Sequence, residues 1–474
     1  MRLALLLLVA ACTAAPAPKG PRVELTACRL KNTGLPARCG KLKVPEDRAH
    51  PEKRQIELRI AVIPALAREP APDPLFLLAG GPGQAATEAF GPLLGAFERV
   101  RRTRDLVLVD QRGTGSSNPL RCDVHEPGAP LAERLNADVV PDETFKKCLA
   151  GYQADPRFYT SAIAMQDLDE VRAALGYAQI NLWGGSYGTR AALVYLRDHG
   201  GHARAAILDG VAPPQLVLPL NFAADAQRSI DLLFSQCAAD PACAKTFPNL
   251  PGRFNQLLKE LESKPARIHA QDPLTGAWSD VELSRAAFTS GLRGILYQQD
   301  LASLVPLMID RATKGDFAPF IASTAGLESV SQSMSTGMTF SVVCAEDLRG
   351  VTEARAEEEA KGTFLGPRAA RDFLRICSFW PRGDAPPQAP IHSDVPVLLL
   401  SGELDPVTPP HWADTAAETL PNSARFVVPG VGHGATGEGC VPQLIEQFLD
   451  KRDPKKLDAK CLEPLKRPPF FVSF

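Results

Sequence analysis

The chain has 474 residues, of which 45% are hydrophobic and 22% charged, and its 52 Lys and Arg against 54 Asp and Glu leave a formal net charge of −2. This length allows two to four ordinary domains or one large domain with an insertion, and the composition is that of a globular protein with a packed core. The balanced charge argues against a nucleic-acid groove or a polybasic membrane surface, and the 43 Pro and 36 Gly follow no period, which excludes a collagen-like chain.

The chain begins with an apolar segment, residues 1–11, MRLALLLLVAA. A run of about nine apolar residues after one Arg is too short to span a bilayer and is typical of a signal peptide. We interpret residues 1–23 as signal peptide and tether, and expect an exported protein, periplasmic, envelope-bound or secreted, with no transmembrane helix in its mature form. The sequence before Cys12 resembles a bacterial lipoprotein cleavage box, which predicts a lipid anchor on Cys12. The alternative is ordinary cleavage at residues 13–17, which discards this cysteine.

Ten further cysteines support export, because they fall into five pairs of sequence neighbours. These are Cys28 and Cys39, Cys122 and Cys148, Cys237 and Cys243, Cys344 and Cys377, and Cys440 and Cys461. Ten cysteines permit hundreds of pairings, so sequence does not fix the connectivity, but short loops close at the lowest entropic cost. We expect the five local disulfides and an oxidising compartment. No C-x-x-C motif is present and we expect no metal site. Free thiols in a cytoplasmic enzyme are the alternative.

Seven strands are predicted along the chain. Residues 55–64 alternate apolar and polar side chains, typical of a strand with one buried face. The others are short, nearly continuous apolar runs that favour strands covered on both faces, at residues 75–78, 106–109, 180–183, 205–208, 395–400 and 426–428. Helical periods lie between them, at residues 165–175 and 187–199. This alternation predicts an α/β fold with a mostly parallel, doubly wound sheet.

Residues 217–384 have a different pattern, dominated by amphipathic helices. Helices are predicted at residues 222–237, 254–261, 285–297 and 301–313, and a hairpin at residues 268–281. We predict that this insertion is a helical cap over the C-terminal edge of the sheet, where ligands bind in such folds. The cap divides the core into a first part, residues 24–216, and a C-terminal part, residues 385–474.

The strongest motif is GGSYG at residues 184–188, which follows one predicted strand and opens a helix. This strand–turn–helix context is that of a nucleophile elbow, in which small neighbours let the central Ser adopt a strained turn. We predict Ser186 as a nucleophile, with the N–H of Tyr187 as one donor to the oxyanion. The alternative is a glycine-rich turn without chemistry.

A second glycine turn, AGGPG at residues 79–83, also ends a predicted strand. Its exposed N–H groups can supply the other oxyanion donor, and we name Gly81, with Gly80 as the second choice. A nucleotide-binding loop is disfavoured, because neither the dinucleotide fingerprint nor the phosphate-loop motif is present.

A hydroxyl nucleophile needs a base, and the base needs an orienting carboxylate. His433 lies in the glycine turn VPGVGHG after the last predicted strand, and Asp405 lies in SGELDPVTPP after the strand before it. We predict Ser186, Asp405 and His433 as a catalytic triad, in the chain order that α/β-hydrolases use. Glu403 and Asp209 are the rival acids. This chemistry requires no cofactor or metal.

These motifs, together with DQRGTG at residues 110–115, resemble those of the proline iminopeptidase family of serine peptidases, in particular its secreted tripeptidyl-aminopeptidase-like branch. The resemblance covers about residues 40–215 and 385–465. It implies an α/β-hydrolase fold, peptide substrates cleaved from a free N-terminus through an acyl-enzyme, and cap carboxylates that hold the α-ammonium group. For this role we name Glu346, and Asp347 after it. The cytoplasmic iminopeptidases have the motif HGGPG, and here Ala79 stands at the position of its His. This difference argues against a strict preference for substrates with proline.

Two other functions remain open at this stage. A carboxylesterase or lipase uses the same triad, because the cap decides which substrate enters. A non-catalytic envelope protein that retains the fold is the second alternative.

Overall fold

The computed structural model describes residues 23–472, except residues 32, 124–127, 136–139, 325–333 and 387. Most of the predicted signal peptide and tether, including Cys12, lies outside the described residues. Within the described part, no helix has the length and apolar character that a membrane crossing requires.

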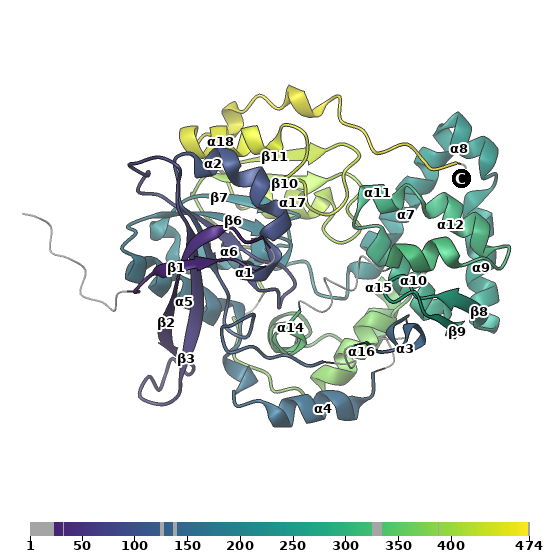
Figure 1. Ribbon diagram of the computed structural model, residues 1–474, viewed down its shortest axis with the longest axis horizontal. Coiled ribbons are helices and arrows are strands. Elements are labelled where there is room, and N and C mark those ends of the chain that lie inside the picture. Colours follow the sequence, from purple (N-terminus) through teal and green to yellow (C-terminus); the bar gives the residue numbers. More distant parts are fainter. Residues whose placement is uncertain are drawn as a thin grey trace, which may run out of the picture.

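A nine-stranded sheet forms the centre of the larger part of the molecule (Figure 1), in the order β1-β2-β3-β5-β4-β6-β7-β10-β11. The strands are β1 (Thr26–Arg29), β2 (Pro36–Pro45), β3 (Gln55–Ile63), β4 (Leu75–Leu78), β5 (Leu106–Val109), β6 (Ile180–Gly185), β7 (Ala203–Asp209), β10 (Val397–Gly402) and β11 (Ser423–Val428). The pairs β1–β2, β2–β3 and β3–β5 are antiparallel, and all other pairs are parallel. The predicted α/β-hydrolase fold with a mostly parallel sheet is confirmed.

The short apolar runs are buried on both faces of this sheet. In β4, Phe76 and Leu78 join the hydrophobic cluster on one face, while Leu75 and Leu77 join the cluster on the other. Strands of this kind carry no polar face, which explains why their sequences do not alternate. The first two strands were not predicted. In β2 the alternation is weak, because two of its buried positions are the small residues Ala37 and Cys39.

Helices cover both faces. On one face lie α5 (Ser161–Leu175), α6 (Tyr187–His199) and α17 (Pro410–Ala417), and on the other η1 (Gly91–Phe97), α2 (Glu98–Arg101) and α18 (Val441–Lys451). Shorter helices occupy the connections: α1 (Ala86–Ala89), α4 (Asp142–Gly151), η2 (Pro156–Phe158), η3 (Gly200–His202), η5 (Pro454–Lys456) and η6 (Lys460–Leu462).

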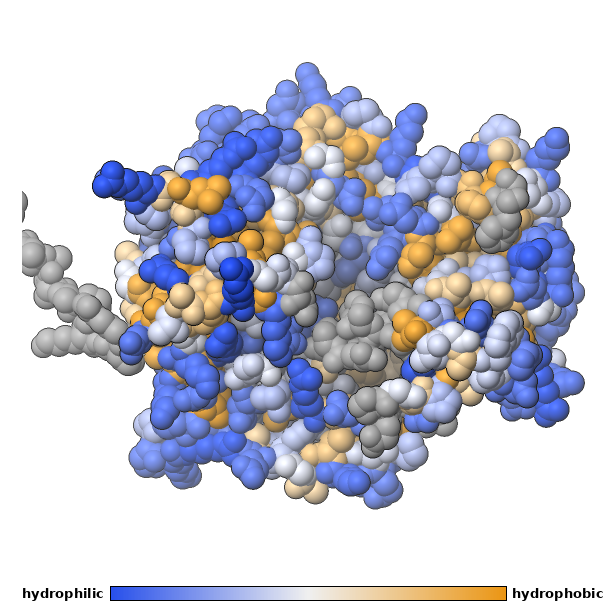
Figure 2. Space-filling view, in the orientation of Figure 1, coloured by the Kyte–Doolittle hydropathy of each residue, from blue (hydrophilic) through white to orange (hydrophobic). Residues whose placement is uncertain are grey.

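A second group of elements forms what we call the helical lobe, set to one side of the sheet in Figure 1. It contains α7 (Phe222–Ala239), α8 (Pro241–Thr246), α9 (Leu250–Ser263), α10 (Arg285–Ile295), α11 (Gln299–Ala302), α12 (Val305–Ala312) and the hairpin β8 (Ala266–Gln271)–β9 (Trp278–Leu283). The lobe has a hydrophobic cluster of its own, which Leu131 of α3 (Leu131–Leu135) and Phe470 also enter. Figure 2, in the same orientation, shows hydrophilic side chains over much of the visible surface and a recess between the helical lobe and the part that contains the sheet.

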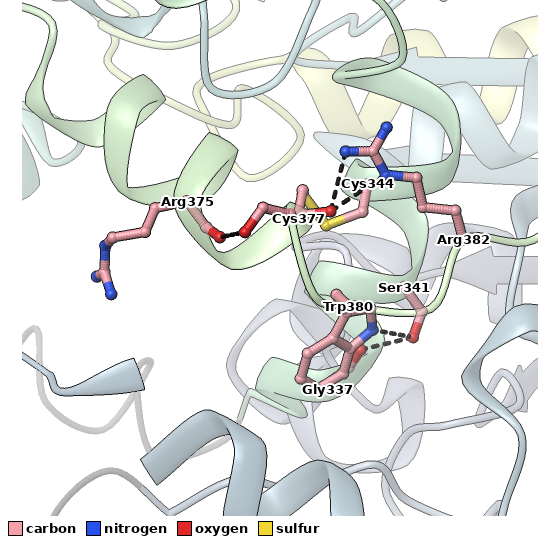
Figure 3. Close-up of a disulfide and its surroundings, with 8 residues drawn as sticks. Gly337, Ser341, Cys344, Arg375, Cys377, Trp380 and Arg382 are labelled. Carbon is pink, nitrogen blue, oxygen red and sulfur yellow. Dashed lines mark hydrogen bonds between the residues drawn. A yellow bond between two sulfur atoms is a disulfide. The ribbon is translucent and has the colours of Figure 1, made fainter. Parts of the chain in front are cut away.

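The last elements of the insertion lie between the lobe and the sheet. They are α14 (Thr336–Val342), η4 (Val343–Asp347), which is a π-helix, α15 (Glu353–Glu359) and α16 (Arg368–Cys377). Met338 of α14 shares the hydrophobic cluster of the sheet. A disulfide from Cys344 to Cys377 links η4 to α16, and beside it the indole of Trp380 donates a hydrogen bond to Ser341 (Figure 3).

All five local disulfides expected from the sequence are formed. The paired cysteines are 6 to 33 residues apart in the chain. They link strands β1 and β2, the connection around α4, the end of α7, the η4–α16 region and the segment that follows the last strand. Cross-links of this kind form and persist in oxidising compartments.

Candidate active site

Ser186 occupies a sharp turn between β6 and α6. Its backbone has φ 55° and ψ −125°, a strained conformation for a residue with a side chain. Two glycines permit the turn, because a Cβ on Gly184 would lie 2.3 Å from the carbonyl oxygen of Gly188, and one on Gly188 would lie 2.2 Å from that of Leu78. The GGSYG sequence therefore folds as the predicted elbow and presents Ser186 at the end of β6.

Asp405 and His433 form a hydrogen-bonded pair in the loops after β10 and β11. Nδ1 of His433 lies 2.8 Å from Oδ2 of Asp405, which is fully buried. Oδ1 of Asp405 accepts the N–H groups of Val407 and Thr408, both at 2.8 Å. The hydroxyl of Thr408 donates to Oδ2 at 2.8 Å and lies 3.1 Å from Nδ1 of His433. These contacts hold the carboxylate in one orientation toward the imidazole.

The pair stabilises the charged forms of both members. Burial disfavours the imidazolium, but the charge and hydrogen bond of Asp405, with the charge of Asp209, raise the pKa of His433 overall. Burial likewise opposes the carboxylate, but the charge of His433 and the hydrogen bonds lower the pKa of Asp405. An imidazole in this environment is suited to take a proton and to hold it beside a permanent negative charge.

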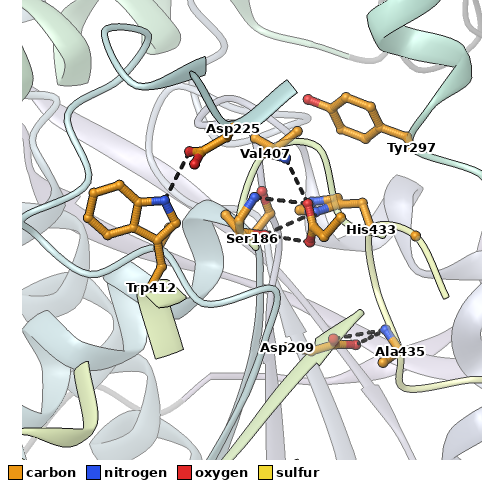
Figure 4. A network of polar contacts seen from close by, with 12 residues as sticks. Ser186, Asp209, Asp225, Tyr297, Val407, Trp412, His433 and Ala435 are labelled. Carbon is orange, nitrogen blue, oxygen red and sulfur yellow. Dashed lines mark hydrogen bonds and ion pairs between the residues drawn. The ribbon is translucent and has the colours of Figure 1, made fainter. Parts of the chain in front are cut away.

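Two contacts link the position of Ser186 to that of His433. The N–H of Ser186 donates to the carbonyl of Asp209 at 2.9 Å. The next residue, Gly210, lies against the imidazole, since a Cβ on it would be 3.1 Å from Cε1 of His433. Figure 4 shows Ser186 and His433 at the centre of this network. The structure thus brings the three predicted residues to the same end of the parallel strands.

The two rival acids hold the histidine loop. Both oxygens of Asp209 accept the N–H of Ala435, and Oδ2 also accepts the N–H and hydroxyl of Thr436. Glu403 accepts the N–H of Gly430 at 2.8 Å. Neither acid is hydrogen-bonded to the imidazole, and Asp405 is the carboxylate that contacts His433.

The two predicted oxyanion donors flank the nucleophile. Tyr187 follows Ser186 at the start of α6. Gly81 follows Gly80, where a Cβ would lie 3.2 Å from the Cβ of Ser186. Within the part of the chain that the structure describes, neither the N–H of Gly81 nor that of Tyr187 has a hydrogen-bond acceptor. Two unoccupied donors beside a nucleophile are what an oxyanion site requires.

Glu346 and Asp347, the predicted ammonium-binding residues, lie against the start of α5 and against α6, respectively, and are engaged in other contacts. The Asp347 carboxylate accepts two bonds from Arg190, at 2.8 and 2.9 Å, and one from the N–H of Leu218. Glu346 accepts the N–H and hydroxyl of Ser161 at 2.6 and 2.8 Å. The small cavity that Glu346 borders is lined by Ser161 and Arg190 but not by Ser186 or His433. The hydroxyl of Ser161 also lies 2.6 Å from that of Tyr187, so Glu346 approaches the side chain of Tyr187 through Ser161, but neither acid is hydrogen-bonded to Ser186 or His433.

Two residues near the site were missed from the sequence. The ring of Tyr297, just after α10, packs edge-on against His433 with 5.0 Å between centroids, and its carbonyl accepts the N–H of His433 at 2.8 Å. Asp225 of α7 accepts a hydrogen bond from the indole of Trp412 at 2.9 Å. Burial raises the pKa of Asp225 to about 7, against the lowering effect of that bond. Both residues come from the helical lobe, and no local motif marks them.

One group of residues has the composition of a metal site. Among the described residues, Asp169, His199 and His202 place potential ligand atoms within 4.8 Å of one another. Arg172 already pairs with both oxygens of Asp169, at 2.7 and 3.1 Å. His199 is the last residue of α6 and His202 follows it in η3, so both lie about 18 Å from the start of the helix near Ser186. This group is not part of the candidate active site.

Comparisons with known proteins find relatives over most of the chain. Residues 362–461 match a family described as TAP-like protein. The chain is 27% identical to serine protease Hip1 of Mycobacterium tuberculosis, over 93% of this chain and 91% of that protein. It is 28% identical to carboxylesterase B of the same species, over 87% and 84%. It is 25% identical to tripeptidyl aminopeptidase of Streptomyces coelicolor, over 91% and 84%. These matches confirm the resemblance to the tripeptidyl-aminopeptidase-like branch.

Proposed function

We propose that this chain, an α/β-fold serine hydrolase related to the TAP-like proteins, is an exported peptidase that cleaves peptides from a free N-terminus. The observation that carries the proposal is the Asp405–His433 pair, in which a fully buried carboxylate lies 2.8 Å from the partly exposed imidazole, beside the strained elbow of Ser186. The two named relatives that are a serine protease and a tripeptidyl aminopeptidase favour a peptide substrate.

The proposed reaction is acyl transfer through a covalent intermediate. Oγ of Ser186 attacks the peptide carbonyl while its proton passes to Nε2 of His433. The N–H groups of Gly81 and Tyr187 bind the oxyanion, and each such donor typically contributes a factor of about 10²–10³ in turnover. His433 then gives its proton to the leaving amine as the C–N bond breaks. Water attacks the acyl-enzyme with His433 again as base, and Ser186 recovers its proton.

Asp405 has two roles in this scheme. By accepting a hydrogen bond from Nδ1, it fixes the tautomer in which Nε2 is free to take a proton. Its charge also stabilises the imidazolium, which is consistent with the raised pKa of His433. Thr408 assists by donating to the same oxygen, so that this oxygen keeps its orientation when the imidazole turns or is charged.

Recognition of a free N-terminus needs a carboxylate close to the nucleophile. We propose Asp225 for this role in place of Glu346 and Asp347, whose oxygens are engaged elsewhere. Asp225 is 3% exposed and lies beside the proposed catalytic groups in Figure 4. Its Oδ1 is 3.6 Å from Nε2 of His411, and among the residues that the structure describes no basic side chain forms a closer ion pair with it. An α-ammonium group bound there would stabilise the carboxylate against burial.

A carboxylesterase is the second candidate, favoured by the carboxylesterase B relative. A panel of substrates separates the candidates: aminoacyl and tripeptidyl p-nitroanilides with free and blocked N-termini, beside p-nitrophenyl esters. The peptidase proposal predicts hydrolysis of the free-amine anilides and slow hydrolysis of the blocked ones. Hydrolysis of esters alone would contradict it. Absence of labelling by a fluorophosphonate would instead support a non-catalytic protein that retains the fold.

Export remains part of the proposal. The five disulfides are the structural observation that supports an oxidising compartment. We retain the signal peptide at the N-terminus and the lipid anchor at Cys12 as predictions from the sequence. Mass spectrometry of the mature N-terminus distinguishes a diacylated Cys12 from cleavage at residues 13–17.

A further inference from the structure

A cavity of about 670 Å³ lies between the start of α7, helix α10 and the α15–α16 region. A volume of this size accommodates several residues of a peptide. Positive charge is in excess in its lining, which includes the charged residues Arg285, Arg293, Arg368, Arg371, Glu262 and Asp372.

One arginine of this lining differs from the others. Three of the four form ion pairs: Arg285 with Glu262 at 3.2 Å, Arg368 with Asp372 at 3.6 Å, and Arg371 with Glu357 at 2.5 Å. In the described part of the chain, Arg293 forms no ion pair, although its charge counteracts the burial that raises the pKa of the nearby Asp225. It donates one hydrogen bond, from Nη2 to the hydroxyl of Tyr297, and its guanidinium stacks over the ring of Phe222 at 4.1 Å. Its Nε is shielded from solvent and has no hydrogen-bond partner.

This arrangement leaves a guanidinium with unused donors. Arginine has five N–H donors in a planar fork, which matches the two oxygens of a carboxylate. Ion pairs in a partly buried setting are screened less than those on an open surface, so an unpaired charge here favours an anionic ligand. Phe222 and Tyr297 hold the guanidinium in place from two sides, so little side-chain entropy is lost when a ligand binds.

Arg293 also lies close to the proposed catalytic groups. The ring of Tyr297 contacts His433 at 5.0 Å between centroids, and its hydroxyl accepts the bond from Arg293 at 2.9 Å. Because the ring centroid of Tyr297 lies 5.0 Å from that of His433 and 5.3 Å from Cζ of Arg293, the imidazole and the guanidinium are at most about 10 Å apart. This is roughly the span of three extended residues. The lining of the cavity contains neither Ser186 nor His433, so a substrate reaches Arg293 by extending about three or four residues beyond the catalytic groups.

We propose that this cavity is a substrate subsite for a carboxylate, and that Arg293 binds it. The inference rests on the proposed peptidase function and adds a preference that the catalytic groups do not determine. The carboxylate has two sources: the side chain of Asp or Glu on the N-terminal side of the cleaved bond, or the C-terminal carboxylate of a short peptide. Both offer the same bidentate partner to the guanidinium.

Paired substrates test the subsite and separate its two sources. The first arm compares tripeptidyl p-nitroanilides with Glu or Gln placed at each of the three positions in turn. The second arm compares tetra- and pentapeptides with free or amidated C-termini. The wild-type protein is expected to favour the acidic member of at least one pair by tenfold or more in kcat/KM. Arg293→Met is expected to lower this ratio of kcat/KM values below threefold. Arg293→Lys is expected to give a ratio between that of Arg293→Met and that of the wild-type protein.

A matched control is available in the same lobe. Arg311 of α12 is paired with Asp316 at 2.9 Å and does not line the cavity, so Arg311→Met should keep the wild-type ratio. A wild-type ratio near one in both arms refutes the subsite, as does a ratio that Arg293→Met leaves unchanged. Thermal unfolding and fluorophosphonate labelling show whether each variant is folded. If Arg293→Met does not fold, the ratio measured with Arg293→Lys decides in the same way.

Failure of the peptidase function would give a different result. If no anilide is cleaved although fluorophosphonate labels Ser186, the peptidase proposal fails and the subsite is tested by protection. The amidated tripeptides Ala-Glu-Ala and Ala-Gln-Ala are compared for how strongly each slows the labelling. Stronger protection by the Glu peptide in the wild-type protein, lost in Arg293→Met, supports the subsite. The same comparison is made with Glu or Gln at the other two positions and with free-acid against amidated Ala-Ala-Ala, and equal protection within every pair refutes the subsite.

Discussion

The substitution Asp405→Asn tests the link between the carboxylate and the imidazole with little change of shape. Oδ1 of Asp405 accepts two backbone N–H groups, from Val407 and Thr408, while Oδ2 faces Nδ1 of His433. The new amide must direct its oxygen toward the two N–H groups, because its NH₂ group is a donor and leaves them unsatisfied otherwise. Its NH₂ group then points at Nδ1, which forces the proton of the imidazole onto Nε2.

An imidazole protonated on Nε2 cannot take the proton of Ser186. In a triad of this kind the wrong tautomer lowers kcat by about 10⁴, equivalent to about 5 kcal/mol of transition-state stabilisation. The hydroxyl of Thr408 can rotate to donate elsewhere, so we expect the variant to fold. We therefore expect a large loss of kcat with a small change in the thermal unfolding midpoint.

Initial rates on a p-nitroanilide and on a p-nitrophenyl ester measure this loss. Glu403→Gln is the matched control, because Glu403 lies in the same turn and its amide analogue still accepts the N–H of Gly430. The activity of the control should stay within about threefold of that of the wild-type protein, because a substitution that keeps shape and hydrogen bonding usually has a small effect. Activity of Asp405→Asn within tenfold of the wild-type protein, or an equal loss in the control, would refute the assignment.

Three further predictions follow from the same contacts. Because the pKa of His433 is raised above its ordinary value of 6.5 and only neutral imidazole is a base, kcat/KM should rise with pH along an acid limb centred above pH 6.5; a flat profile from pH 5 to 8 contradicts this. Asp225→Asn should lower kcat/KM at least tenfold for free-amine substrates and leave blocked substrates unaffected; an equal loss for both indicates a structural role instead. Replacing both Cys344 and Cys377 by Ser opens a loop of 33 residues and should lower the thermal midpoint, measured by calorimetry, by roughly 5–10 °C; an unchanged midpoint contradicts the stabilising role of this disulfide.

Much of the sheet could be predicted because its strands are buried on both faces. The runs at residues 75–78 and 106–109 have no polar position. Each run ends at a glycine-containing or charged turn, and these turns mark the C-terminal edge of the sheet, where ligands bind in such folds. The strained turn at Ser186 could also be predicted from its neighbours in the sequence. Close backbone contacts leave no room for a side chain at Gly184 or Gly188, so the turn requires glycine at both positions. Features that depend on a few neighbouring residues are accessible from sequence.

Features that depend on packing between distant segments were not accessible. Tyr297 and Asp225 approach the site because the helical lobe docks against the loops after β10 and β11, and their local sequences are those of ordinary amphipathic helices. Glu346 and Asp347 were expected at the substrate because they are adjacent acids near the end of the insertion. The π-helix that contains them instead faces α6 and the start of α5, where Arg190 forms an ion pair with Asp347 and Ser161 donates hydrogen bonds to Glu346.

The central claim is that Ser186 is the nucleophile and that His433 and Asp405 activate it. Tryptic mass spectrometry after reaction with a fluorophosphonate tests this most directly. The account predicts a single adduct on the peptide that contains Ser186, absent in Ser186→Ala, and a strongly reduced labelling rate in His433→Ala and Asp405→Asn. An adduct on another residue, or peptide hydrolysis that persists in Ser186→Ala, would contradict it.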